Sequence, residues 1–240
     1  MQERSFGSAQ EPEKYKYIIK EKTMIILTNF KTYETAIGEK AIQLAKIHEL
    51  VAKETSVNFA VAPSMLDIQK VTETCSSIPV FAQHVDDAGY GSFTGHVPAK
   101  QLAGFGVQGV ILNHSENRLP EDYIKTCVKS AKESGLKIII CAENVKEGVK
   151  FMSYNPDFIA VEPPELIGGD ISVSTANPEI ISDAVEKIGK GKVIVGAGIK
   201  NAEDVRIAKK LGASGVLLAS GVTKSSDPQA VLRDLAKGVK

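Results

Sequence analysis

The chain has 240 residues, of which 43% are hydrophobic and 24% charged, and its 29 basic residues balance its 29 acidic ones. This composition argues against a disordered chain and a basic nucleic-acid-binding domain, and the apolar runs are too short for a membrane span. Three cysteines without a C-x-x-C pair indicate neither a disulfide framework nor a thiolate zinc site, so we expect a soluble, cytoplasmic protein. Length alone allows one large domain or two small ones.

The start of the chain differs from the rest because residues 1–23 mix basic and acidic side chains and contain no continuous apolar core. They resemble neither a secretory signal nor a transit peptide. A second methionine, Met24, stands directly before the first apolar run. We therefore predict a flexible N-terminal extension over residues 1–23 and a folded domain over residues 24–240.

From Met24 onward, short runs rich in Val and Ile alternate with longer segments of helical period. The runs are apolar on both faces, as parallel strands covered by helices must be. Pro120 opens one helical segment and Gly135 closes it, and Asp227-Pro228 caps and opens the last one. We predict strands at Met24–Asn29, Val57–Ala62, Val80–Gln83, Gly109–Leu112, Lys137–Cys141, Phe158–Val161, Lys192–Val195 and Gly215–Leu218.

These eight strand-and-helix units follow one another without a low-complexity linker. A doubly wound open sheet also alternates strands and helices, but eight uninterrupted units favour closure of the sheet. The sequence therefore predicts an α/β fold with one domain, a (β/α)8 barrel.

In such a barrel the reacting groups come from the carboxyl ends of the strands. Three titratable residues, Lys31, His114 and Glu162, follow the first, fourth and sixth predicted strands. Alone, each fits a surface charge or a capping group, but three at strand ends favour one site. Small residues follow strands seven and eight, where barrels often bind phosphate through main-chain N–H groups.

Five segments keep a fixed order and spacing from Met24 onward: Asn29-Phe30-Lys31-Thr32-Tyr33, Gly91-Ser92-Phe93-Thr94-Gly95-His96, Asn113-His114-Ser115-Glu116, Val161-Glu162-Pro163-Pro164-Glu165-Leu166-Ile167-Gly168 and Val216-Leu217-Leu218-Ala219-Ser220-Gly221. Together they resemble the triosephosphate isomerase family, whose fold is the TIM barrel, and its short archaeal form in particular. The resemblance implies a cofactor-free interconversion of dihydroxyacetone phosphate and D-glyceraldehyde 3-phosphate through an enediol or enediolate, in glycolysis and gluconeogenesis.

The resemblance also assigns roles to the residues at the strand ends. It implies that Glu162 is the base that removes a proton next to the carbonyl. His114 and Lys31 would stabilise the charge that develops on the substrate oxygens, with Asn29 binding and orienting the substrate. Glu116 would support the site by holding the lysine.

For the substrate phosphate, the resemblance implies binding by Gly198, Ala219 and Ser220, with Gly221 in support. Strand seven ends in Gly196-Ala197-Gly198, which lacks the serine hydroxyl of the bacterial and eukaryotic forms and resembles the archaeal form. Main-chain N–H groups would then be the only donors at this strand.

The segment after strand six resembles the family's lid, whose closure would exclude water from the reaction. Pro163-Pro164 stiffens its start, the main chain of Ile167 is implied to contact substrate, and Gly168 supports its flexible end. The next residues, Gly169-Asp170, replace the Thr-Gly usual in the archaeal pattern. An inward-pointing carboxylate there is expected to weaken phosphate binding.

The longest segment without predicted structure is His84 to Pro98, and the resemblance makes the range Gln83 to His96 a protruding loop. The loop would dock on a second copy of the chain and bring Thr94 toward the active site of that copy, in a dimer or a tetramer of dimers. His84, Asp86, Asp87 and His96 lack a ligand spacing such as H-E-x-x-H, so we expect no metal.

Cysteine and histidine residues outside these motifs carry less information. Cys75 and Cys127 fall on helical faces and are expected in the core. Cys141 and Glu143 match a family pair near the base, or are a small buried thiol beside a capping carboxylate. His48 falls on a predicted helix without an evident partner and receives no role.

Two other functions stay open at this point. Another phosphate-binding barrel, such as a sugar-phosphate epimerase or an indole-forming synthase, would share the glycine-rich anchor but use a different acid-base set or a metal. A non-catalytic barrel would bind sugar phosphates without turning them over. The presence of Asn29, Lys31, His114 and Glu162 argues against the second possibility.

Overall fold

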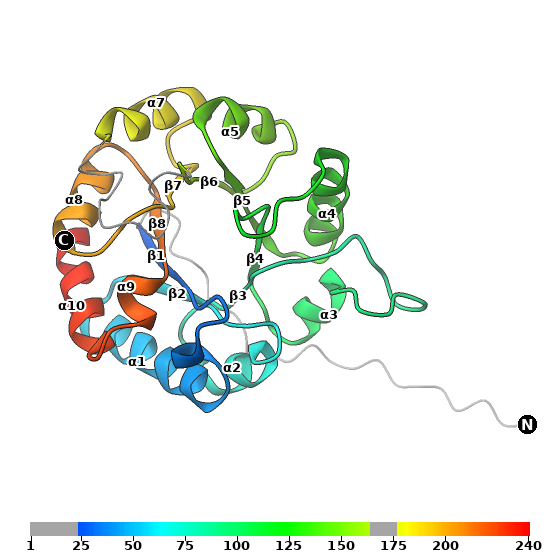
Figure 1. Cartoon of the computed structure of the whole chain (residues 1–240), viewed down its shortest axis with the longest axis horizontal. Coiled ribbons are helices and arrows are strands. Elements are labelled where there is room, and N and C mark those ends of the chain that lie inside the picture. Colours follow the sequence, from blue (N-terminus) through cyan, green and yellow to red (C-terminus); the bar gives the residue numbers. More distant parts are fainter. Residues whose placement is uncertain (1–23, 164–176) are drawn as a thin grey trace, which may run out of the picture.

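The structure is a computed structural model that describes residues 24–163 and 177–240. The predicted extension over residues 1–23 lies outside the described residues. All the strands are parallel and form one sheet in the order β2-β1-β8-β7-β6-β5-β4-β3, which curls into a barrel surrounded by helices (Figure 1). A parallel bridge between Val61 and Val80 joins the two ends of this order. The strands are β1 (Ile25–Asn29), β2 (Asn58–Ala62), β3 (Phe81–Ala82), β4 (Gly109–Leu112), β5 (Lys137–Ala142), β6 (Phe158–Val161), β7 (Val193–Val195) and β8 (Gly215–Leu218).

The predicted (β/α)8 barrel and all eight of its strands are confirmed. The bounds of β4, β6 and β8 are as predicted, and those of the other strands differ by one residue at one or both ends. The helices are α1 (Glu39–Thr55), α2 (Ile68–Thr74), α3 (Ala99–Gly104), α4 (Glu121–Glu133), α5 (Val145–Met152), α7 (Pro178–Ile188), α8 (Ala202–Lys210), α9 (Ser220–Thr223) and α10 (Pro228–Val239), with a 3-10 turn, η2, at Glu34–Ala36.

Local sequence signals fix several helix starts. The side chain of Asp227 accepts a hydrogen bond from Ala230 N–H and caps α10, as its position before Pro228 predicts. Asn201 and Asp204 form a capping box at the start of α8. In the described residues, no helix is both long enough and apolar enough to cross a membrane.

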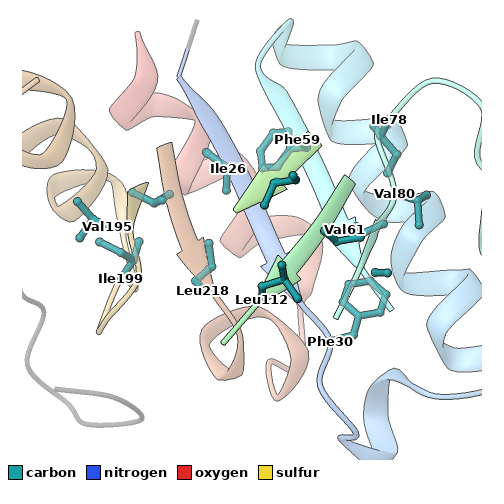
Figure 2. Packing of buried hydrophobic residues seen from close by; sticks show 14 of the residues in the cluster. Ile26, Phe30, Phe59, Val61, Ile78, Val80, Leu112, Val195, Ile199 and Leu218 are labelled. Carbon is teal, nitrogen blue, oxygen red and sulfur yellow. The ribbon is translucent and has the colours of Figure 1, made fainter. Parts of the chain in front are cut away.

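Alternate residues of each strand face the two sides of the barrel wall. Outward-facing side chains such as Ile26, Val61 and Leu112 pack in the layer between the strands and the helices (Figure 2). A separate inner cluster fills the barrel and contains Ile25, Leu27, Ala60, Ala62, Phe81, Ile111, Ile139, Cys141, Ala160, Ile194 and Leu217.

The same alternation decides what lies at the mouth of the barrel. Two residues beyond Leu27 stands Asn29, and two beyond Ala160 stands Glu162, so both continue the inward-facing row at the carboxyl ends of their strands. The barrel interior is closed by apolar packing below this level. Polar chemistry is therefore confined to one rim, as the fold predicts.

Candidate active site

A cavity opens at the carboxyl ends of β1, β4, β6, β7 and β8. It brings together residues that are up to 192 positions apart in the chain, from Asn29 to Gly221. Its lining residues are Asn29, Lys31, Tyr33, His114, Glu162, Gly196, Gly198, Ile199, Lys200, Leu217, Leu218, Ala219, Ser220 and Gly221.

Most of the predicted site residues therefore meet at this cavity. Four predicted site residues are not among the lining residues that the structure describes, for different reasons. Glu116 reaches the site by pairing with a lining residue, and Thr94 is exposed on the loop between β3 and α3. Ile167 and Gly168, with the departure at Gly169-Asp170, lie outside the described residues.

Lys31 is held in place by both its backbone and its side chain. Its backbone has a left-handed φ of 48°, and its N–H donates to Asn29 Oδ1 over 3.0 Å. Its Nζ lies 2.6 Å from Glu116 Oε1. Because Glu116 is exposed, water screens this pair, which contributes more to the position of the ammonium group than to stability.

Gln83 supports the same turn and was not recognised as a site residue from the sequence. Its Nε2 donates to Lys31 O over 3.0 Å and to Ala62 O over 2.9 Å. The side chain thus ties the turn after β1 to the end of β2. The rule that strand-end residues carry chemistry could have found it, because the sequence placed Gln83 at the end of the third predicted strand.

His114 follows β4, and one of its ring nitrogens lies close to the carboxylate of Glu162. The N–H of Glu116 donates to His114 Nδ1 over 3.2 Å, so Nδ1 is an acceptor and the ring proton of the neutral form is on Nε2. Burial, followed by the nearby charge of Lys31, lowers the pKa of His114 against an opposing effect of Glu116. The result is a neutral imidazole with a donor at Nε2, which lies 3.8 Å from Glu162 Oε1.

Glu162 is the one carboxylate among the described residues that line the cavity, and 2% of its surface is exposed. Burial raises its pKa to about 7, although the neighbouring thiol of Cys141 and the charge of Lys31 partly oppose the shift. Its Oε2 has no hydrogen-bond partner among the described residues. A buried carboxylate oxygen without a partner and with a pKa near neutrality is suited to accept a proton from a bound molecule.

The backbone of Gly196 forms the wall behind this carboxylate. A β-carbon at position 196 would lie 2.3 Å from Glu162 Cγ and 2.8 Å from Oε1. Only glycine therefore leaves room for the observed position of Glu162. The sequence pattern related this glycine to the phosphate end of the site and gave no sign of its contact with Glu162.

Cys141 and Glu143 lie in different surroundings, the first buried and the second exposed. The buried thiol of Cys141 lies beside Glu162, and burial, reinforced by that carboxylate, raises the pKa of the thiol well above its ordinary value. Glu143 is exposed on the rim, where its Oε1 lies 3.6 Å from Arg118 Nε. Cys75 and Cys127 are buried in the core, as predicted.

The loop between β3 and α3 protrudes from the barrel (Figure 1). Asp86 holds the two ends of this loop together. Its carboxylate accepts hydrogen bonds from Val97 N–H at 2.7 Å and from Tyr123 OH at 2.8 Å, and His84 Nε2 lies 3.0 Å from Asp86 Oδ1. Burial opposes the shift, but these contacts hold the pKa of Asp86 below its usual value. Across residues 24–163 and 177–240, no three His, Cys, Asp or Glu side chains are grouped so that they could hold a metal ion.

The comparisons with known proteins all point to one family. The family model for triosephosphate isomerase matches residues 24–237. The chain is 46% identical over 216 residues to the triosephosphate isomerase of Methanosarcina acetivorans, a match that covers 88% of this chain and 97% of that protein. It is 43% identical over 218 residues to that of Methanocaldococcus jannaschii, covering 89% and 99%. For that of Thermoplasma volcanium the identity is 44% over 214 residues, covering 88% and 99%.

Proposed function

The chain belongs to the triosephosphate isomerase family, and from this premise we propose that Glu162, His114 and Lys31 are the catalytic residues of its reaction. The reaction is the interconversion of dihydroxyacetone phosphate and D-glyceraldehyde 3-phosphate. The observation that carries the assignment is the arrangement of Glu162 and His114, whose Oε1 and Nε2 atoms lie 3.8 Å apart at one cavity.

In the first step, a Glu162 carboxylate oxygen takes a proton from the carbon next to the substrate carbonyl, and the electron pair moves toward the carbonyl oxygen. The partnerless Oε2 supports this role, because no protein donor competes for it in the described part of the chain. The same carboxyl group then returns the proton to the neighbouring carbon, while the proton of the substrate hydroxyl passes to the former carbonyl oxygen, so that the old hydroxyl becomes the new carbonyl. The base ends the cycle in the form in which it began, so no net redox change or co-reactant is required.

The negative charge that forms on the substrate oxygen needs donors that are already in place. His114 supplies the Nε2–H of a neutral ring, and Lys31 supplies an ammonium group held by Glu116. Asn29 fixes the turn that carries the lysine and lines the cavity itself. No metal or organic cofactor is needed for this chemistry, and we propose that the reaction proceeds without one.

We place the phosphate group at the ends of β7 and β8. Gly198, Ala219, Ser220 and Gly221 line the cavity there, and Ser220 begins α9. The first N–H groups of a helix lack partners within the helix and favour an anion. Their positive potential, together with Lys31, provides a local field in a chain of zero formal net charge.

We also propose that residues 24–240 act as one catalytic unit in the cytoplasm and associate with a second copy through the loop from Gln83 to His96. Exposed aromatic side chains support the docking role, since Tyr90 and Phe93 are 74% and 42% exposed on this loop. Docking would bring Thr94 toward the active site of the second copy. Light scattering of the full chain, with and without a Phe93→Ser substitution, tests this association.

A coupled assay distinguishes the isomerase from the other phosphate-binding barrels. Turnover of D-glyceraldehyde 3-phosphate that is unaffected by a chelator supports the proposed reaction, whereas a metal-dependent epimerase would lose its activity. Binding of phosphoglycolohydroxamate, a planar enediolate mimic, separates the enzyme from a non-catalytic binder. A catalyst should bind the mimic much more tightly than substrate, because its site complements the transition state.

A further inference from the structure

Asn113 occupies a strained backbone position directly before His114. It follows the last residue of β4, is buried with 2% exposure, and has a left-handed φ of 61°. Residues other than glycine rarely adopt this backbone conformation, and asparagine is among those that tolerate it best. The chain direction that aims His114 into the cavity thus depends on the residue type at position 113.

Both halves of the Asn113 carboxamide are used. Its Nδ2 donates to the carbonyl of Cys141 at the end of β5 over 3.0 Å, and its Oδ1 accepts from Leu119 N–H over 2.9 Å. The first partner can only accept and the second can only donate, so the orientation of the amide is fixed. An aspartate at this position could serve Leu119 but could not donate to the Cys141 carbonyl.

One of these bonds closes the segment that carries His114 and Glu116. The bond to Leu119 closes a loop in which Asn117 N–H donates to His114 O over 2.8 Å and Glu116 N–H donates to His114 Nδ1. Glu116 in turn pairs with Lys31. One carboxamide therefore organises the loop that presents the histidine and the partner of the lysine.

The bond to Cys141 links this loop to the base. Cys141 uses its carbonyl for Asn113 while its thiol lies beside Glu162. The two sides of the proposed reaction, proton removal and charge stabilisation, are thus joined through adjacent strand ends.

We infer that Asn113 is a positioning residue for the isomerase reaction: its left-handed backbone and its two buried hydrogen bonds hold the His114 ring in line with Glu162. The inference rests on the proposed function. Asn113 has no contact with the reacting atoms in this role and acts through His114 and its loop.

The decisive variant is Asn113→Gly, because glycine keeps the left-handed φ without strain and removes both side-chain hydrogen bonds. The matched control is Asn155→Gly. Asn155 is exposed, has a φ of 57°, and lies between α5 and β6, at the opposite rim. Asn113→Gly should lower kcat by about 10-fold to 10²-fold, because small displacements of a catalytic group cost this much, and should change KM by less than about 3-fold. Asn155→Gly should leave kcat within about 2-fold.

A second variant, Asn113→Asp, decides the question where glycine prevents folding. It keeps the shape of the side chain and the acceptor for Leu119 but loses the donor to Cys141, and we expect the same loss of kcat. A third readout is independent of turnover: ¹⁵N NMR of the His114 ring should show an Nε2–H tautomer in the control and a mixture of tautomers in Asn113→Gly.

The outcomes separate this inference from the proposed function. If the folded Asn113 variants match the control in kcat and in tautomer, the positioning role of Asn113 is wrong while the isomerase assignment stands. If the unmodified protein and Asn155→Gly both fail to turn over triose phosphate, the proposed function itself is wrong.

Discussion

Gly196 packs directly against the side chain of Glu162, and a β-carbon added to this glycine would lie 2.3 Å from Glu162 Cγ. Real β-carbon contacts are essentially never this short, so any side chain at position 196 would force Glu162 to move. The position of the Glu162 side chain is therefore set by the residue that follows β7 as well as by its own strand, β6.

A Gly196→Ala substitution should therefore displace the carboxylate of Glu162. We expect kcat to fall by about 10²-fold, with about 1–3 kcal/mol lost in the free energy of unfolding because of overpacking. The control is Gly104→Ala at the exposed end of α3, where an added β-carbon meets nothing within 4 Å. Steady-state kinetics that show equal kcat for the two variants would remove Gly196 from the account.

Glu162 should cost stability at neutral pH, because its pKa in the folded chain is about 7 against an ordinary value of 4.5. The folded state resists deprotonation, so the penalty is absent below pH 4.5, grows as the pH rises to 7, and is complete above it. Glu162→Gln does not titrate and should raise the free energy of unfolding at pH 8 by up to about 3 kcal/mol.

Urea unfolding of the two proteins at pH 8 and pH 4.5 measures this effect. The advantage of Glu162→Gln should be present at pH 8 and small at pH 4.5. A difference that does not change with pH would show that burial of the carboxylate is not its cause.

His48 predicts a second pH dependence, which has the same cause, burial of an ionisable group, but the opposite direction. It is fully buried, with Nδ1–H donating to Leu44 O and Nε2 accepting from Thr28 Oγ1, each over 2.8 Å. Burial lowers its pKa from 6.5 to about 4. The unfolded chain therefore binds a proton between pH 6.5 and 4 that the folded chain does not, and stability falls as the pH falls through this window.

His48→Gln keeps one donor and one acceptor but does not titrate. Between pH 7.5 and pH 5, the unmodified protein should lose about 2 kcal/mol more unfolding free energy than this variant. Chemical denaturation at the two pH values gives the comparison. Equal losses would mean that His48 is not the acid-sensitive group.

Lys31 should matter for catalysis far more than for stability. Removal of a preorganised donor to a developing oxyanion costs about 10²-fold to 10³-fold in rate, whereas an ion pair with an exposed partner contributes no more than about 1 kcal/mol. We expect Lys31→Met to show this contrast in kinetics and in thermal unfolding. The control, Lys137→Met, breaks an ion pair of 2.8 Å with Asp157 at the amino end of β5 and should leave kcat unchanged. Similar kinetics for both variants would contradict the role of Lys31.

The sequence predicted the elements that depend on local pattern. Buried strands, caps and the row of strand-end residues all follow from period and position, which is why Asn29, Lys31, His114 and Glu162 could be named before their distances were known. The resemblance to a family then supplied their roles. What the pattern could not provide was the partner of each residue across the barrel.

Three residues illustrate this limit. Gln83 bonds to carbonyls 21 and 52 positions away, Asn113 bonds to a carbonyl 28 positions away, and His48 bonds to a hydroxyl 20 positions away. None of these spacings matches a helical or strand period. The bonds of Gln83 and Asn113 follow from the side-by-side arrangement of strands in the barrel, and that of His48 follows from the packing of α1 against β1.

The assignment of Glu162 as the base is the central claim, and turnover of D-glyceraldehyde 3-phosphate by Glu162→Asp tests it most directly. The substitution keeps the charge and retracts the carboxylate by one methylene, so kcat should fall by about 10²-fold while the fold is retained. Glu143→Asp, the same change on the exposed rim, is the control and should keep its full kcat. Unchanged turnover in Glu162→Asp would contradict the account.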